Sequence, residues 1–175
     1  MSDHDIAPSN FKFVTHWQQD SADNDAAVVE FWKSENALSG DIKVEERLRQ
    51  VVLHAQSATG EVAAVCTAIP MTLPRLGQPM YYFRCFVGRK WRKSRLVFAL
   101  LTRAFDILEN YARANAYPCI GVLLELENAR FGETLLAPRW PKTQFVYIGK
   151  SQRNLDLRVR YFAGARLKKA AAPKI

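Results

Sequence analysis

Five basic side chains within seven positions could bind an anion. They are Arg89, Lys90, Arg92, Lys93 and Arg95, and they follow the apolar run YYFRCFV at residues 81–87. An amphipathic pattern begins directly after them, so a strand is expected to pass into a helix here. Unpaired N–H groups and the helix dipole favour an anion at a helix N-terminus. The spacing therefore predicts a phosphate-bearing ligand at this turn, and the alternative is a solvated helix start.

Two carboxylates could accept a proton. Glu125 and Glu127 lie near the end of the apolar run CIGVLLELEN at residues 119–128. Alternation along a strand places both side chains on one face. The pair can act as a general base, or it can simply neutralise nearby arginines.

Neither a metal site nor a nucleophilic triad is indicated. Cys66, Cys85 and Cys119 each lie in an apolar run without CxxC spacing, which is typical of reduced core cysteines. The three histidines are widely scattered. We therefore expect no metal cofactor.

Charge is distributed unevenly along the chain. Residues 1–50 carry ten acidic and five basic side chains, a balance of −5, and residues 51–175 carry seven and twenty, a balance of +13. A basic body of this kind could bind an anionic cofactor, an acidic protein, a nucleic acid or a membrane surface. The polar, acidic start and the lack of an apolar run of about 18 residues predict a cytoplasmic protein without a transmembrane segment.

The length and the 49% hydrophobic content suit one compact α/β domain. We expect a tail and lead-in at 1–24, a domain at 25–165 and a basic tail at 166–175. Helical periodicity or punctuation predicts helices at 26–38, 43–50, 97–112 and 128–137, and strand-like runs lie at 51–56, 61–69, 81–88, 119–128, 144–149 and 155–162, with a loop at 70–79. The strands at 81–88 and 119–128 and the long helix between them form a βαβ unit, so these two strands should be parallel.

This order of elements resembles the GNAT N-acyltransferase superfamily over residues 25–162. The resemblance implies an α/β fold with a mixed, mostly antiparallel sheet of six or seven strands, helices on both faces and a splayed central parallel pair. In the family, the turn after the fourth strand reads Arg/Gln-x-x-Gly-x-Gly/Ala and wraps the pyrophosphate of acyl-coenzyme A with backbone amides.

The register of that turn departs from the family pattern. Val87 matches the strand-end valine and Trp91-Arg92 the aromatic-Arg pair, and the paired leucines of the following helix also align. Arg95 and Val97 then stand where the two small residues belong. Either the loop binds phosphates with side chains as well as amides, or it no longer binds coenzyme A.

The other family features concern the acid and a related branch. Asn128 fits the asparagine after the fifth strand, whereas the usual tyrosine position falls near Leu135. In the family this tyrosine often protonates the leaving thiolate, and Tyr147 is the phenol that could replace it. The alternative is that Tyr147 is a buried structural tyrosine. The segment from Arg84 to Val87 is similar to the Ser-Arg-Phe sequence of acyl-homoserine-lactone and N-acyl amino acid synthases, which take acyl chains from acidic acyl carrier protein.

The resemblance thus implies an acyltransferase that moves an acyl group from acyl-coenzyme A or acyl carrier protein to an amine. Its catalytic candidates are Glu125, Glu127 and Tyr147. Its donor-binding candidates are Phe86, Val87, Arg89, Arg92, Lys93, Ser94, Arg95, Leu96 and Asn128. The alternative is an inactive GNAT-like module that binds an acidic protein or nucleic acid through its basic face. We do not favour a nucleic-acid partner, and a homodimer is an open alternative.

Overall fold

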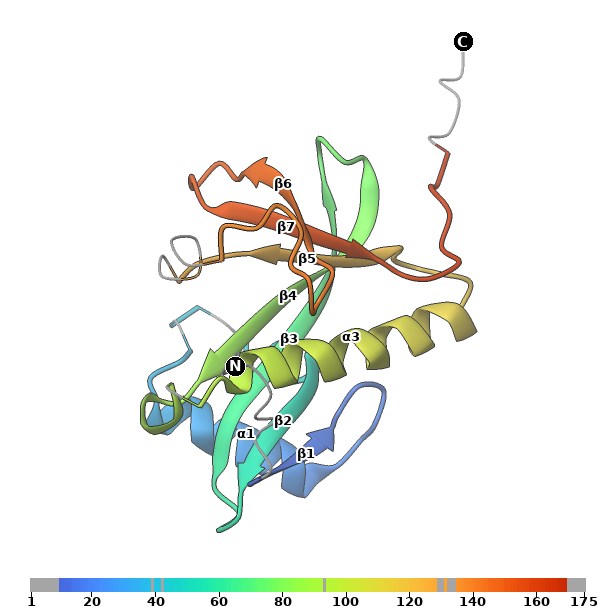
Figure 1. Cartoon of the computed structure of the whole chain (residues 1–175). Helices are drawn as coiled ribbons and strands as arrows, with labels where there is room; N and C mark the ends of the chain where they lie inside the picture. Colours follow the sequence, from blue (N-terminus) through green and yellow to red (C-terminus); the bar gives the residue numbers. More distant parts are fainter. Residues whose placement is uncertain are drawn as a thin grey trace. The chain divides into compact units, whose positions relative to one another are not determined.

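The computed structural model describes residues 10–38, 40–41, 43–92, 94–128, 131 and 135–169. Seven strands form one sheet in the order β1-β2-β3-β4-β5-β7-β6 (Figure 1). The pairs β1–β2, β2–β3, β5–β7 and β6–β7 are antiparallel, and β4–β5 is parallel. This confirms the mixed, mostly antiparallel sheet with a central parallel pair.

The bounds of the elements are as follows. The strands are β1 (Phe11–Thr15), β2 (Val51–Ser57), β3 (Val62–Leu73), β4 (Gln78–Val87), β5 (Gly121–Glu125), β6 (Val146–Lys150) and β7 (Asp156–Tyr161). The helices are α1 (Ala22–Ser34), α2 (Val44–Leu48), the 3-10 turn η1 (Arg89–Trp91) and α3 (Leu96–Ala114). The chain divides into two compact units, residues 1–68 with 84–107 and residues 69–83 with 108–175.

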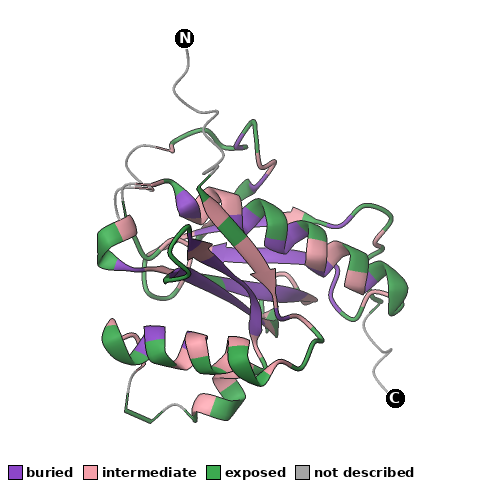
Figure 2. Cartoon of the chain, turned by 90° about the horizontal axis from the view of Figure 1, so that it is seen from below, coloured by how far each residue is buried: buried purple, intermediate pink, exposed green. Residues whose placement is uncertain are grey.

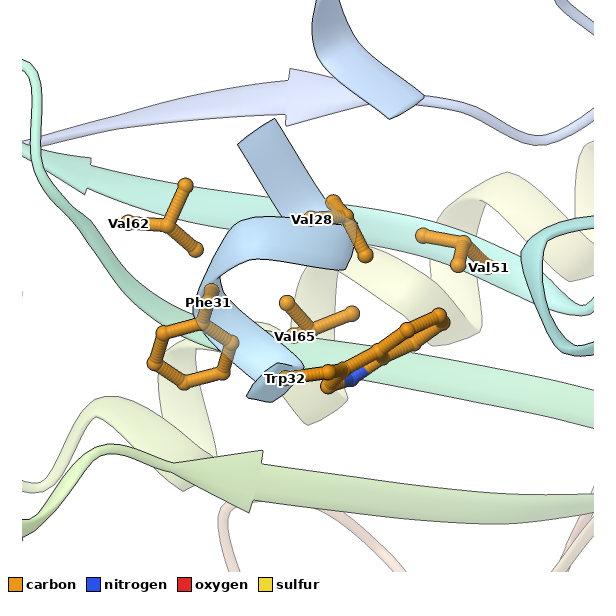
Figure 3. Packing of buried hydrophobic residues seen from close by; sticks show 6 residues of the cluster. All are labelled: Val28, Phe31, Trp32, Val51, Val62 and Val65. Atoms are coloured by element: carbon orange, nitrogen blue, oxygen red, sulfur yellow. The ribbon is translucent and has the colours of Figure 1, made fainter. Parts of the chain in front are cut away.

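The core of the first unit forms where α1 packs on the sheet. Val28, Phe31 and Trp32 follow the i, i+3, i+4 spacing that gathers side chains on one helix face. They pack against Val51 of β2 and against Val62 and Val65 of β3 (Figure 3). Burial of each such side chain contributes about 1.5–3 kcal/mol, so this contact fixes α1 to the sheet. Figure 2 shows the resulting contrast between the buried strands and the partly exposed helix surfaces.

The first turns of α3 cover the opposite face of the first unit. The guanidinium of Arg103 lies 4.2 Å from the centre of the Phe13 ring on β1. Val14, the next residue, pairs with His54 and shares its sheet face. The His54 side chain bonds His16, which in turn bonds Asp25 of α1, so this face is the one that α1 covers. Since successive strand residues face opposite sides, α1 and α3 lie on different faces. The predicted arrangement of helices on both faces is confirmed.

The second unit has its own core on β4, β5 and β7. Met80, Tyr82, Ile120, Leu123, Leu157 and Val159 are buried together. Gly121 of β5 permits a close approach of β7, because a Cβ atom there would collide with the Arg160 carbonyl. This packing fixes the end of β5, where the predicted carboxylates stand.

Two predictions of elements need correction. Phe11–Thr15 is a strand that pairs with β2, although the sequence analysis placed these residues in a tail and lead-in at 1–24. The predicted loop at 70–79 is largely strand, since β3 continues to Leu73 and β4 begins at Gln78. Pro70 is tolerated because β2 pairs with β3 only as far as Thr67. The helix predicted at 128–137 lies mostly outside the described residues, of which Phe131 is helical and 135–137 are irregular.

Candidate functional site

The basic turn of the first unit starts at a tightly packed glycine. The Gly88 N–H donates to the Ala63 carbonyl at 2.9 Å. An added Cβ would lie 3.1 Å from Phe31 Cε2 and 3.2 Å from Glu35 Oε1. Before it, Phe86 packs edge-on against Phe31, with ring centres 5.9 Å apart, and Val87 is half-buried. The end of β4 is therefore held against α1 and β3.

Two of the five basic residues are neutralised within the fold. Arg89 Nε lies 3.3 Å from Glu35 Oε2, and its backbone N–H donates to the same oxygen. Lys90 Nζ pairs with Glu61 Oε2 at 2.7 Å and lies 4.6 Å from the centre of the Trp91 ring. These two cations are already matched by carboxylates, which makes them weaker candidates for an external anion.

The remaining part of the turn presents exposed cations ahead of α3. Arg92 is exposed and has no ion pair within the described residues, Arg95 is also exposed, and Lys93 lies outside the described residues. Ser94 Oγ donates to the Trp91 carbonyl at 2.6 Å. Leu96 is buried and begins α3, so it can offer a ligand only its backbone.

The backbone at Arg95 has the conformation that glycine usually supplies. Its φ angle is +56°, in the left-handed region that residues with a Cβ rarely adopt. The sequence register places Arg95 where the GNAT turn has a small residue. The backbone at this position is thus left-handed although Arg95 carries a Cβ atom. The sequence predicted that the strand passes directly into the helix at the five basic residues. The 3-10 turn η1 instead separates Arg89 and Lys90 from the first turn of α3.

The predicted carboxylates of the second unit lie together but differ in environment. The Glu125 side chain is 10% exposed and accepts a hydrogen bond from the Tyr82 hydroxyl at 2.7 Å. Glu127 is 59% exposed and accepts from both Nη1 and Nη2 of Arg153, at 3.1 and 3.0 Å. Arg153 Nη1 also reaches Glu125 at 3.4 Å. The hydrogen bond with Glu127, followed by the charge of Glu125, raises the pKa of Arg153.

Arg153 is presented by a braced turn between β6 and β7. The Ser151 hydroxyl accepts hydrogen bonds from the N–H groups of Arg153 and Leu155, at 3.1 and 3.3 Å. The Ser151 N–H donates to the Leu155 carbonyl, and Asn154 has a left-handed φ of +59°. Sequence reasoning missed both Tyr82 and Arg153. Tyr82 was part of an apolar strand, and no local pattern pairs Arg153 with residues 26 and 28 positions away.

Tyr147 lies on the other face of the second unit. It pairs with Arg158, which pairs with Leu124, whereas Glu125 pairs with Leu157. The Arg158 guanidinium lies 5.8 Å from the Tyr147 ring centre and 4.4 Å from that of Trp140. The structure therefore brings Glu125 and Glu127 together and does not bring Tyr147 to them.

The remaining sequence predictions concern Asn128, a metal site and a membrane-spanning helix. Asn128 is exposed just beyond β5, and its carbonyl accepts from the Phe131 N–H at 3.0 Å. Within the described ranges, no group of three or more histidine, cysteine or acidic side chains could hold a metal ion. None of the described helices is long and apolar enough to cross a membrane.

The sequence matches no family model and no curated protein. Solved structures do match it. An acetyltransferase of the GNAT family from Streptococcus pneumoniae is 12% identical, with a TM-score of 0.58 over 87% of this chain and 99% of that one. The chain has the GNAT fold.

Two further GNAT-fold structures match over similar lengths. A GCN5-related N-acetyltransferase from Kribbella flavida is 12% identical, covers 89% of this chain and 100% of its own, and has a TM-score of 0.55. yncA, a putative acetyltransferase from Salmonella typhimurium solved with acetyl-CoA, is 16% identical over 94% and 98% of the two chains, at a TM-score of 0.53. At these identities the likeness establishes the fold alone.

Proposed function

We propose that this protein is an N-acyltransferase that moves an acyl group from an acyl thioester to an amine. The observation that carries the proposal is the turn between β4 and α3. It combines a left-handed backbone at Arg95 with exposed arginines at positions 92 and 95, directly before a 19-residue helix. Backbone amides and cations at such a point suit the phosphates of an acyl donor.

The donor roles proposed for the first unit follow from position along the turn. The backbone groups of Phe86 and Val87 would polarise the thioester and align the donor chain. Arg92 and Arg95 would pair with phosphate oxygens, together with Lys93 and the Ser94 hydroxyl, while Leu96 would contribute its N–H. Arg89 would act mainly through Glu35, to which it is bound. Asn128, in the second unit, is proposed as a further polar contact to the donor.

Acyl transfer itself needs one bond formed, one bond broken and two proton movements. The amine nitrogen attacks the thioester carbonyl, the C–S bond breaks, and the amide forms. The nitrogen loses a proton, and the leaving thiolate takes one up. Glu125 is the base proposed for the first proton, because Glu127 is committed to Arg153 by two hydrogen bonds. Because Tyr147 lies on the sheet face opposite to Glu125, we propose water rather than Tyr147 as the donor of the second proton, and an unchanged kcat in Tyr147→Phe would support this.

The donor is acyl-coenzyme A or acyl carrier protein. Structures with this fold that hold acetyl-CoA include those of the Salmonella protein and of AtaTR. Both donors carry a phosphopantetheine arm, and the carrier protein adds an acidic surface that exposed arginines would attract. Titration with acetyl-coenzyme A, a long-chain acyl-coenzyme A and an acyl carrier protein distinguishes them.

Isothermal titration with these three donors tests the proposal. At least one donor should bind the wild-type protein, and Arg92→Ala should weaken that donor about tenfold or more, as expected for the loss of a charge-assisted hydrogen bond. The matched control is Lys169→Ala, which removes an exposed cation of the C-terminal segment and should leave the dissociation constant unchanged.

Two outcomes would contradict the proposal. If no donor produces heat or a thermal shift, the alternative of an inactive module that binds an acidic protein or nucleic acid through its basic face gains support. The antitoxin-bound AtaT toxin, which matches this fold at a TM-score of 0.54, shows that a GNAT-fold protein can bind another protein. If Arg92→Ala and Lys169→Ala weaken binding equally, the β4–α3 turn is the wrong donor site.

A further inference from the structure

Tyr82 contacts the carboxylate that the proposed function requires as a base, and nothing in the sequence pattern assigned it a role. Its hydroxyl donates to Glu125 Oε2 at 2.7 Å, a short hydrogen bond to a charged acceptor. Arg153 approaches the same oxygen at 3.4 Å and is bound more closely by Glu127. The Tyr82 hydroxyl is therefore closer to the Glu125 carboxylate than the Arg153 guanidinium is.

Tyr82 is held rigidly by its surroundings. It is 5% exposed and packs in the cluster with Met80, Leu123 and Leu157. On β4 it stands opposite Leu123 of β5 in the parallel register. Glu125 lies two residues beyond Leu123 and so projects from the same face. Because the Tyr82 ring is packed, its hydroxyl has a fixed position and favours one orientation of the Glu125 carboxylate.

The hydroxyl also affects the charge state of Glu125. As a donor it stabilises the carboxylate anion more than the neutral acid, so the group takes up a proton less readily. Arg153 acts in the same direction, and Glu127 acts against it but is itself matched by Arg153. The next charged residues on β6 and β7, Lys150 and Asp156, pair with each other.

We propose that Tyr82 is a positioning residue that holds the Glu125 carboxylate in one orientation and, together with Arg153, lowers its affinity for a proton. This inference rests on the proposed function only in taking Glu125 as the base. The orientation and the proton affinity of Glu125 can be measured without any substrate.

The pH dependence of Tyr82→Phe tests the inference. Loss of a hydrogen bond to a charged group should lower kcat about 10- to 100-fold. The acid limb of the kcat/KM profile should move to higher pH by about one unit, since Glu125 would bind a proton more readily. Arg153→Gln should move the limb in the same direction, because it removes a cation and leaves Glu127 unmatched. The matched control is Tyr161→Phe, which removes an exposed phenol hydroxyl on β7 and should leave the profile unchanged.

NMR provides a measurement that needs no acyl donor. The Cζ resonance of Tyr82 should change with pH at the same midpoint as the Glu125 side-chain carboxyl. In Tyr82→Phe, that carboxyl midpoint should move to higher pH. If the midpoints agree and no donor binds, the proposed function fails while the Tyr82–Glu125 coupling stands.

Two results would overturn the inference. The first is a Tyr82 resonance that is insensitive to the titration of Glu125. The second is a Tyr82→Phe variant that loses activity with an unshifted acid limb and an unshifted carboxyl midpoint, which would mean that Tyr82 serves packing alone.

Discussion

At the scale of single residues, two histidines that looked unrelated in the sequence form a buried pair. His16 Nδ1 donates to Asp25 Oδ1 at 3.2 Å, which leaves Nε2 to accept from His54 Nδ1 at 2.6 Å. His54 Nε2 is then a buried acceptor without a partner in the described structure. Burial, followed by the charges of His16 and Lys12, lowers the pKa of His54 to about 4. Both rings are therefore neutral at pH 7.

This pair predicts a stability that decreases in acid. The unfolded chain binds a proton at His54 near the ordinary pKa of 6.5, and the folded chain binds it only near 4. Stability is thus full above pH 6.5 and is lost as the pH falls toward 4, by at most about 1.4 kcal/mol per pH unit for one proton. Burial also lowers the pKa of His16, although Asp25 opposes that shift.

Urea unfolding of wild-type protein and of His54→Gln, measured from pH 7.5 to 4, tests this prediction. Carboxylates contribute to both curves, so the informative quantity is the difference between them. The wild type should lose more free energy of unfolding than the variant over this range. Parallel curves would show that His54 is not the responsible group.

At the scale of elements, Arg158 of β7 holds the segment that precedes β6. Its guanidinium is almost fully buried, and it donates to the carbonyls of Leu135 and Ala137 at 2.9 Å and of Pro138 at 3.3 Å. The ring of Trp140 covers it. Desolvation by burial lowers the pKa of Arg158. Backbone carbonyls and an aromatic face thus stabilise the cation at this position, and they fix an irregular segment to the sheet.

Arg158→Met should therefore destabilise the protein. The substitution keeps the apolar stem and removes three hydrogen bonds and the cation–π contact, so we expect the free energy of unfolding to fall by about 2–4 kcal/mol. Denaturant unfolding measures this change. The control is Arg166→Met at an exposed position, which should alter stability by less than about 0.5 kcal/mol. Equal effects of the two substitutions would mean that the Arg158 contacts contribute little.

The elements also show what the sequence could and could not predict. The periodicity of Leu100, Ala104 and Leu108 was strong enough to place α3 correctly. Strand β1 was missed because its five residues give too short an alternation. At the carboxylates, alternation correctly placed Glu125 and Glu127 on one face, where Arg153 reaches both. The roles of Tyr82 and Arg153 depend on contacts between distant segments, which local patterns do not encode.

At the scale of the whole chain, the uneven charge is partly matched within the fold. Glu35, from the acidic first 50 residues, neutralises Arg89. The net charge of +8 therefore overstates the cations available to a ligand at the β4–α3 turn. The parallel pairing of β4 and β5 was predictable, because the βαβ connection requires it. Because the identity to solved structures is low, the shared fold does not identify the acyl donor, and donor binding is the property to measure.

The most direct test of the central claim is a titration with each of the three donors, acetyl-coenzyme A, a long-chain acyl-coenzyme A and an acyl carrier protein, followed by backbone amide NMR. We predict that the largest shift changes fall on residues 86–97, with the amides of Arg92, Arg95 and Leu96 among the most affected, and that the C-terminal residues 166–169 are unaffected. A spectrum that does not change at saturating donor, or changes confined to residues outside this turn, would contradict the account.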